Sequence, residues 1–153
     1  MHRLFAILSF LVLSTGVVSA QVVDPSRPFS VVVALQDLGY RADLETDSSG
    51  DPKIRSSIEG VNYSFWFYGC TNNQNCTGWN MSAGFDLENG LSMYKVNQWN
   101  RTKLIGRVYL DDQNDPFIDY YVVARGGLDR VTFERVMARW GVAITQFKEH
   151  INW

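Results

Sequence analysis

Two alternating segments joined through a pair of cysteines constrain the fold of this chain more than any other feature. Residues 61–69 are dense in aromatic and β-branched side chains, and residues 77–87 alternate between apolar and polar side chains. If Cys70 lies directly opposite Cys76 in an antiparallel ladder, opposed residues have numbers that sum to 146. A slip of one residue would place the two apolar rows on different faces. The predicted apolar pairs are Phe67–Trp79, Phe65–Met81, Tyr63–Ala83 and Val61–Phe85.

The N-terminal segment predicts that the chain is exported. A basic start, an apolar run over residues 4–13 and small residues before Gln21 are typical of a signal peptide cleaved between Ala20 and Gln21. The apolar run is shorter than the roughly 20 residues of a membrane-spanning helix, and no second run approaches that length. We therefore expect a signal peptide over residues 1–20 and a single domain over 21–153. We expect this product to be periplasmic or secreted, with no membrane span.

The two cysteines are expected to form a disulfide. They are the only cysteines of the chain, and an even count in an exported protein favours a disulfide. A metal site is the alternative, but thiolate sites usually have four ligands. Outside the signal segment the only histidine is His150, near the end of the chain. A Cys70–Cys76 disulfide is therefore the preferred interpretation.

The charge balance bears on the class of partner. The chain has 14 basic and 16 acidic residues, a formal net charge of −2. This balance gives no overall positive field of the kind that directs proteins to nucleic acid or anionic lipid. We therefore expect no nucleic-acid partner.

The other segments predict two hairpins and three helices. A proline-containing start and Gly39 bound a helix over residues 28–38. Charged alternating segments at 42–45 and 53–59 predict one hairpin, and segments 104–110 and 117–124 predict another.

Two of the predicted helices lie in the second half of the chain. A short one begins near Ser92 and ends near Asn100, with Met93, Val96 and Trp99 on one side. A long one is capped by Asp129 and carries an apolar stripe of Phe133, Met137, Trp140, Ile144, Phe147 and Ile151. The predicted fold class is α+β: an antiparallel sheet of about five to six strands with an N-terminal helix, a short middle helix and a long C-terminal helix packed across the sheet.

No catalytic, cofactor-binding or metal-binding constellation stands out, so we expect no cofactor and no enzymatic activity. The densest acidic group is Asp111, Asp112, Asp115 and Asp119. It lacks the glycine and the closing glutamate of a calcium loop, so a solvated hairpin tip is the preferred interpretation. Hydrolysis by paired carboxylates needs a fixed separation in a cleft, which spacing alone does not show.

One surface is a candidate for binding a partner. On the even-numbered face of the 61–69 and 77–87 hairpin, Trp66 and Tyr68 stand with Asn62 and Asn80. Aromatic side chains with small polar neighbours are typical of recognition surfaces. Two interpretations remain open: this face is uncovered and binds a partner, or the first or middle helix lies over it.

Several short motifs resemble the YbjN-like family. They are Val96–Asn100, Arg107–Asp111, the Gly126–Gly127 pair before the last helix, and the Phe67–Cys70 segment, which is similar to the exported two-cysteine branch. Members are bacterial proteins described as sensory transduction regulators, with a fold similar to type III secretion chaperones. The resemblance implies that fold over residues 24–153 and supplies no catalytic residues.

The resemblance favours a non-enzymatic protein-binding, chaperone-like or regulatory module in the periplasm. Its partner would be a protein, and assembly with a second copy of the chain is a further expectation. Two alternatives stay open at this point: a small periplasmic hydrolase that uses Asp or Glu side chains, and a protein that binds a small ligand.

Overall fold

The structure is a computed structural model that describes residues 22–153. The expected signal peptide and its cleavage junction at Ala20–Gln21 lie outside the described residues. Six strands form one antiparallel sheet: β1 (Asp43–Thr46), β2 (Pro52–Ile58), β3 (Val61–Tyr68), β4 (Gly78–Gly84), β5 (Arg107–Leu110) and β6 (Pro116–Val123). Their spatial order is β1-β2-β3-β4-β6-β5, so the last strand in sequence lies between β4 and β5.

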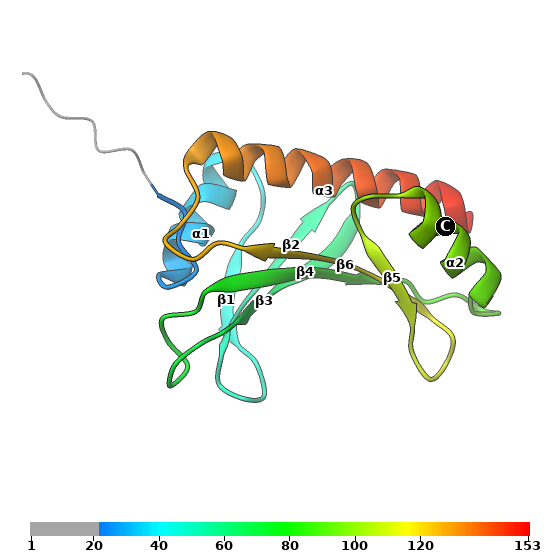
Figure 1. Ribbon diagram of the computed structural model, residues 1–153, viewed down its shortest axis with the longest axis horizontal. Coiled ribbons are helices and arrows are strands. Elements are labelled where there is room, and N and C mark those ends of the chain that lie inside the picture. Colours follow the sequence, from blue (N-terminus) through cyan, green and yellow to red (C-terminus); the bar gives the residue numbers. More distant parts are fainter. Residues whose placement is uncertain (1–21) are drawn as a thin grey trace, which may run out of the picture.

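Three helices complete the α+β fold and confirm the predicted class: α1 (Pro28–Asp37), α2 (Met93–Thr102) and α3 (Arg130–Ile151). Figure 1 shows α3 running along one face of the sheet, with α2 near one end and α1 near the other. The opposite face carries no helix, and the hairpin loops project beyond it (Figure 1). We call this uncovered surface the open face.

The predicted register of β3 and β4 is confirmed. Phe65 lies opposite Met81, and Phe67 lies opposite Trp79. All eight residues of the predicted apolar pairs are buried. The period-two alternation therefore identifies both the partner strand and its offset.

The cysteines form the expected disulfide, but they are not a pair of the ladder. The ladder ends at Tyr68–Gly78, and the chain reverses through a two-residue turn at Asn72 and Asn73, both with positive φ. Such a turn twists in the sense that suits a hairpin, and asparagine tolerates it. The turn pairs Thr71 with Gln74, whose numbers sum to 145, whereas the numbers of each ladder pair sum to 146. The segment from Gln74 to Gly78 is therefore one residue longer than the segment from Tyr68 to Thr71 that lies opposite it. The Cα atoms of the cysteines are consequently 3.8 Å apart, closer than directly opposed ladder residues.

The core lies between the sheet and α3. Every residue of the predicted stripe on α3 is buried, and Asp129 caps the helix by accepting a hydrogen bond from the Thr132 amide at 2.9 Å. Gly141 faces β2 so closely that an added Cβ would lie 3.2 Å from Ile58 Cδ1. Phe147 contacts Phe85 and Trp99 edge-on, with ring centroids 5.3 and 5.0 Å apart. These contacts hold α3 against the sheet and against α2.

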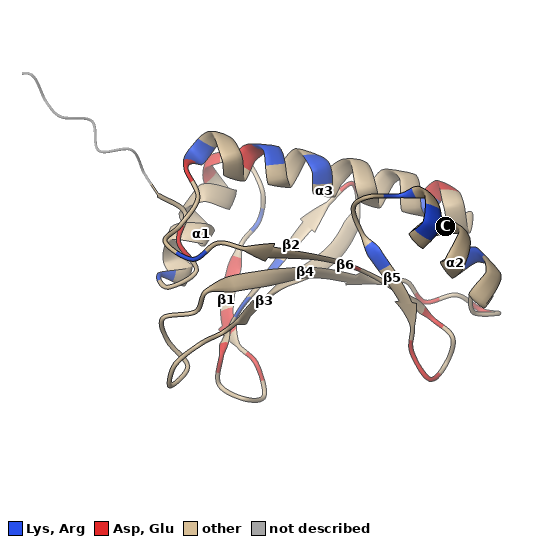
Figure 2. Cartoon of the chain, viewed as in Figure 1, with Lys and Arg blue, Asp and Glu red and all other residues tan. Residues whose placement is uncertain are grey.

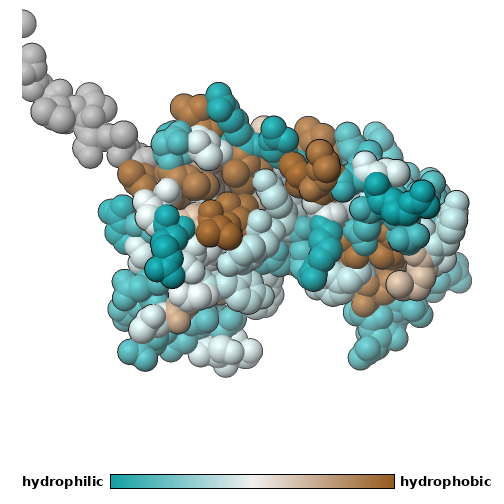
Figure 3. All heavy atoms as spheres, viewed as in Figure 1, coloured by the Kyte–Doolittle hydropathy of each residue, from teal (hydrophilic) through white to brown (hydrophobic). Residues whose placement is uncertain are grey.

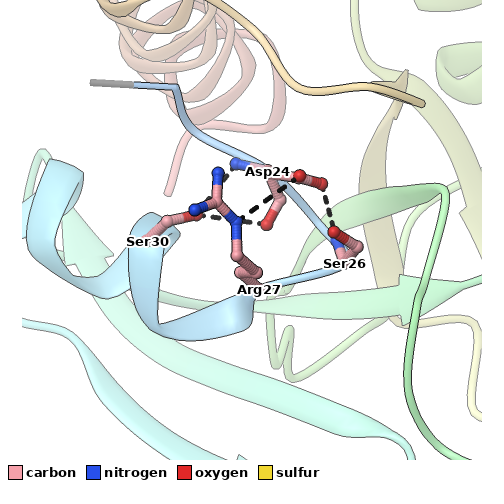
Figure 4. Close-up of polar contacts among 4 residues, drawn as sticks. All are labelled: Asp24, Ser26, Arg27 and Ser30. Atoms are coloured by element: carbon pink, nitrogen blue, oxygen red, sulfur yellow. Dashed lines mark hydrogen bonds and ion pairs between the residues drawn. The ribbon is translucent and has the colours of Figure 1, made fainter. Parts of the chain in front are cut away.

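The start of α1 has no side-chain cap. Arg27 occupies the N-cap position without a side-chain hydrogen bond to the helix, and Pro28 begins the helix. Asp24 instead organises the preceding turn: its carboxylate accepts from the Ser26 amide at 2.9 Å, and its backbone exchanges two hydrogen bonds with the Ser30 hydroxyl. The Arg27 guanidinium lies 3.6 Å from the same carboxylate (Figure 4). The turn therefore sets the direction in which α1 begins.

Two expectations around α2 are wrong. Met93 was expected beside Val96 and Trp99 on the packed side, but its side chain is 68% exposed. Residue 104 was expected to begin a strand, whereas β5 starts at Arg107 and Leu104 lies fully exposed in the preceding loop. The reason is Gly106, which has φ of +85° and leaves no room for a Cβ beside Ile118.

Candidate functional site

The open face brings together side chains from five strands. Trp66 and Asn80 are partly buried, whereas Asn62 and Tyr68 are exposed. The Trp66 ring is partly covered by Lys53, whose Nζ lies 4.2 Å from the ring centroid. No helix lies over these residues, so the interpretation in which α1 or α2 covers them is wrong (Figure 1).

A hollow of about 470 Å³ opens on this face. Its lining residues are Tyr68, Asn80, Arg107, Asp119 and Tyr121. They come from β3, β4, β5 and β6, and the ladder explains their proximity because Asn80 is opposite Tyr121 and Arg107 is opposite Asp119. We call this site the Asp119 hollow. It contains two of the four residues that the sequence singled out, Tyr68 and Asn80.

Asp119 is the most unusual residue of the hollow. It is only 8% exposed, and its Oδ2 lies 2.7 Å from the Arg107 guanidinium. Its Oδ1 is buried and has no hydrogen-bond partner. Burying a carboxylate oxygen without a donor costs free energy, and a ligand that supplies a donor removes that cost. Asp119 Oδ1 is therefore an acceptor that no donor among the described residues satisfies.

The position of Asp119 corrects the expected acidic hairpin tip. Asp111 and Asp115 do lie at that tip, where Asp111 accepts hydrogen bonds from the amides of Gln113 and Asp115 at 2.9 Å. Asp119 lies four residues further on, within β6, and faces the hollow. Its place follows from the alternation of β6, in which Ile118 turns toward the core.

Aromatic rings surround the hollow. Tyr68 and Tyr121 meet edge-on with centroids 6.1 Å apart, and about half of each side chain is exposed. Tyr109 stacks on Phe117 at 5.4 Å. Partial burial raises the pKa of Tyr109, and the nearby Asp119 carboxylate raises it further. The tyrosine therefore remains a neutral hydroxyl that can donate or accept a hydrogen bond.

The hollow is lined by side chains of several chemical types. It combines one carboxylate, one guanidinium, one amide and two exposed aromatic rings. The charges of Asp119 and Arg107 compensate each other, and no second carboxylate lines the hollow.

Within residues 22–153, no three His, Cys, Asp or Glu side chains are grouped closely enough to hold a metal ion. Over the same residues, none of the helices combines the length and apolarity required to cross a bilayer.

Comparison with known proteins identifies one family. Residues 30–153 match the YbjN family model, whose description reads "Putative bacterial sensory transduction regulator". The match includes both cysteines and every residue of the Asp119 hollow. No curated protein and no solved structure matches the chain.

Proposed function

The chain belongs to the YbjN family, and on that premise we propose that it is a non-enzymatic regulatory module that binds a polypeptide partner through the open face. The family is described as regulatory, which agrees with a binding role. The observation that carries the proposal is the Asp119 hollow, where a nearly buried carboxylate with an unpartnered Oδ1 lies beside two half-exposed tyrosine rings.

The composition of the open face supports a protein partner. Tyrosine, tryptophan and arginine are enriched among residues that dominate binding free energy, and all three occur here in Tyr68, Trp66 and Arg107. The rings need no rearrangement to make contact, because Tyr68 and Tyr121 are already half exposed. A partner would place apolar groups on these rings and polar groups beside the Arg107–Asp119 pair.

We place this activity outside the cytoplasm, in the periplasm or after secretion. The signal-like segment at residues 1–20 and the Cys70–Cys76 disulfide both support export, since disulfides persist in oxidising compartments. Mass spectrometry of protein recovered from the extracytoplasmic fraction tests this part directly. The expected mass is that of a chain beginning at Gln21 with no free thiol.

The two alternative functions make different demands on the hollow. A hydrolase that uses paired carboxylates needs a second acidic group beside Asp119, and the lining supplies none. A small-ligand protein usually encloses most of its ligand, whereas this hollow lies open on a broad sheet face. The geometry therefore favours a macromolecular partner over either alternative.

Site-specific photo-crosslinking tests the proposal. A photoreactive phenylalanine analogue replaces Tyr68 or Tyr121 on the open face, and replaces Tyr94 as the control, since Tyr94 is 74% exposed on α2. After irradiation in the extracytoplasmic fraction, we expect a cross-linked polypeptide from the first two positions and none from the third. The added change Asp119→Ala should reduce the yield from position 68. Equal products from all three positions, or none from the open face, would contradict the proposal.

A further inference from the structure

A second surface lies on the helical side of the molecule. A groove of about 570 Å³ runs between the connection from α2 to β5 and the outer side of α3. Leu104 stands on one side of it and is fully exposed, at 105% of its reference area. Val142 on α3 lies across from it and is 56% exposed. Figure 3 shows hydrophobic spheres at the surface where this connection passes α3. We call this site the α3 groove.

The α3 groove carries a positive rim. Lys103, Arg135 and Arg139 line it, and no acidic side chain does. Within the described chain, none of these three cations takes part in an ion pair with a carboxylate. Figure 2 shows several basic residues along α3, which also carries acidic residues near its two ends, and further acidic residues in the hairpin loops on the other side of the molecule. The net charge of −2 therefore conceals a local basic and apolar surface.

The required occupant is both anionic and apolar. The two exposed apolar side chains of the α3 groove, Leu104 and Val142, lie among three cations in a lining that holds no carboxylate. A projecting leucine that shares a groove with three cations suits a lipid surface, since acyl chains accept the apolar side chain and phosphates attract the cations.

We propose that the α3 groove binds the surface of a bilayer that contains anionic phospholipid, with Leu104 entering the acyl-chain region and Lys103, Arg135 and Arg139 facing the phosphates. The interaction is peripheral, because it uses a few side chains and no spanning helix. It is also compatible with partner binding, since α3 and the open face lie on opposite sides of the sheet (Figure 1). A chain held in this way presents the Asp119 hollow away from the membrane.

Vesicle sedimentation tests the proposal with two lipid compositions. One set contains phosphatidylcholine alone, and the other contains equal parts of phosphatidylcholine and phosphatidylglycerol. All variants are recovered from the extracytoplasmic fraction of one host so that they share the same N-terminus. We expect binding to the anionic vesicles only, and weaker binding when NaCl is raised from about 50 to about 300 mM, because salt screens the charges.

The variants separate the two components of the surface. Leu104→Ser should lower the partition coefficient about tenfold by removing the inserted side chain. Each of Arg135→Gln and Arg139→Gln should lower it about fivefold. Val123→Ser and Arg125→Gln are the matched controls, since both side chains are exposed away from the groove. The controls should bind as the parent does, and circular dichroism verifies that every variant is folded.

Several outcomes would overturn the proposal. They are equal binding to neutral and anionic vesicles, no binding to either, or unchanged binding of Leu104→Ser and of the two arginine variants. A dimer in solution that Leu104→Ser dissociates would also overturn it, because the groove would then serve a second copy of the chain. None of these results bears on cross-linking at Tyr68, so the two proposals fail independently.

Discussion

Replacing Arg107 with alanine should destabilise the chain more than replacing Asp119, although the two side chains form one ion pair. The asymmetry arises from their burial. Asp119 is 8% exposed, whereas the Arg107 side chain is 72% exposed. After Arg107→Ala, the carboxylate stays in the sheet without the one charge that compensates its burial. After Asp119→Ala, the guanidinium returns to water.

The magnitudes follow from those environments. A buried charge that loses its partner costs about 2–3 kcal/mol, at the lower end of the usual range because water can reach the vacated Arg107 position. Losing a largely exposed ion pair costs about 0–1 kcal/mol. The two variants should therefore differ by about 2 kcal/mol, or about thirtyfold in the folding equilibrium.

Urea unfolding, followed by tryptophan fluorescence, measures the difference. The double variant Arg107→Ala/Asp119→Ala should unfold close to Asp119→Ala, because no buried charge remains. Arg55→Ala is the control on the same face, since Arg55 pairs with Glu45 in a more exposed setting and should cost less than about 1 kcal/mol. Equal costs for the two single variants, or a larger cost for Asp119→Ala, would refute the reasoning.

Three further predictions test the core and the hairpin. Cys70→Ser should lower the free energy of unfolding by about 2 kcal/mol, the value for closing so short a loop. Its far-ultraviolet circular dichroism spectrum should keep the signal of the sheet, and loss of that signal would count against the prediction. Burial raises the pKa of Tyr63. The stability that the neutral Tyr63 hydroxyl contributes is therefore complete below its unfolded-state pKa of about 10 and is lost as the pH rises further. The urea midpoint should fall with rising alkaline pH in the parent and fall less in Tyr63→Phe. An equal fall in both proteins would argue against this. Phe147→Ala should cost about 3–5 kcal/mol because the ring is fully buried against Phe85 and Trp99, and a calorimetric cost below about 2 kcal/mol would exclude tight packing of α3.

The strands and helices could largely be predicted because their signals are local. Alternation with period two identifies β3 and β4, and the stripe with helical period identifies α3. The place of β6 between β4 and β5 could not be predicted, because alternation identifies a strand but not its neighbour in space. Leu104 was misplaced for a related reason: an apolar residue before a strand resembles its first residue, and the turn at Gly106 depends on contact with the distant Ile118.

Two of the five residues that line the candidate site were visible in the sequence as partner-surface residues. Tyr68 and Asn80 stand on the polar side of one local hairpin, so their alternation identifies them. Sequence reasoning misses Arg107, Asp119 and Tyr121, because they join the hollow only through the strand order. A partial signal exists, since β6 alternates so that Asp119 and Tyr121 share the face opposite Ile118. That signal would have separated Asp119 from the acidic tip.

The two outer strands of the sheet, β1 and β5, have a consequence for behaviour at high concentration. Each contains only four residues, and charged side chains occupy Asp43 and Glu45 in one and Arg107 in the other. Unpaired edges invite strands from neighbouring molecules, and short charged edges discourage that growth. The short charged edges thus oppose strand-by-strand growth even though the partly aromatic open face is left uncovered.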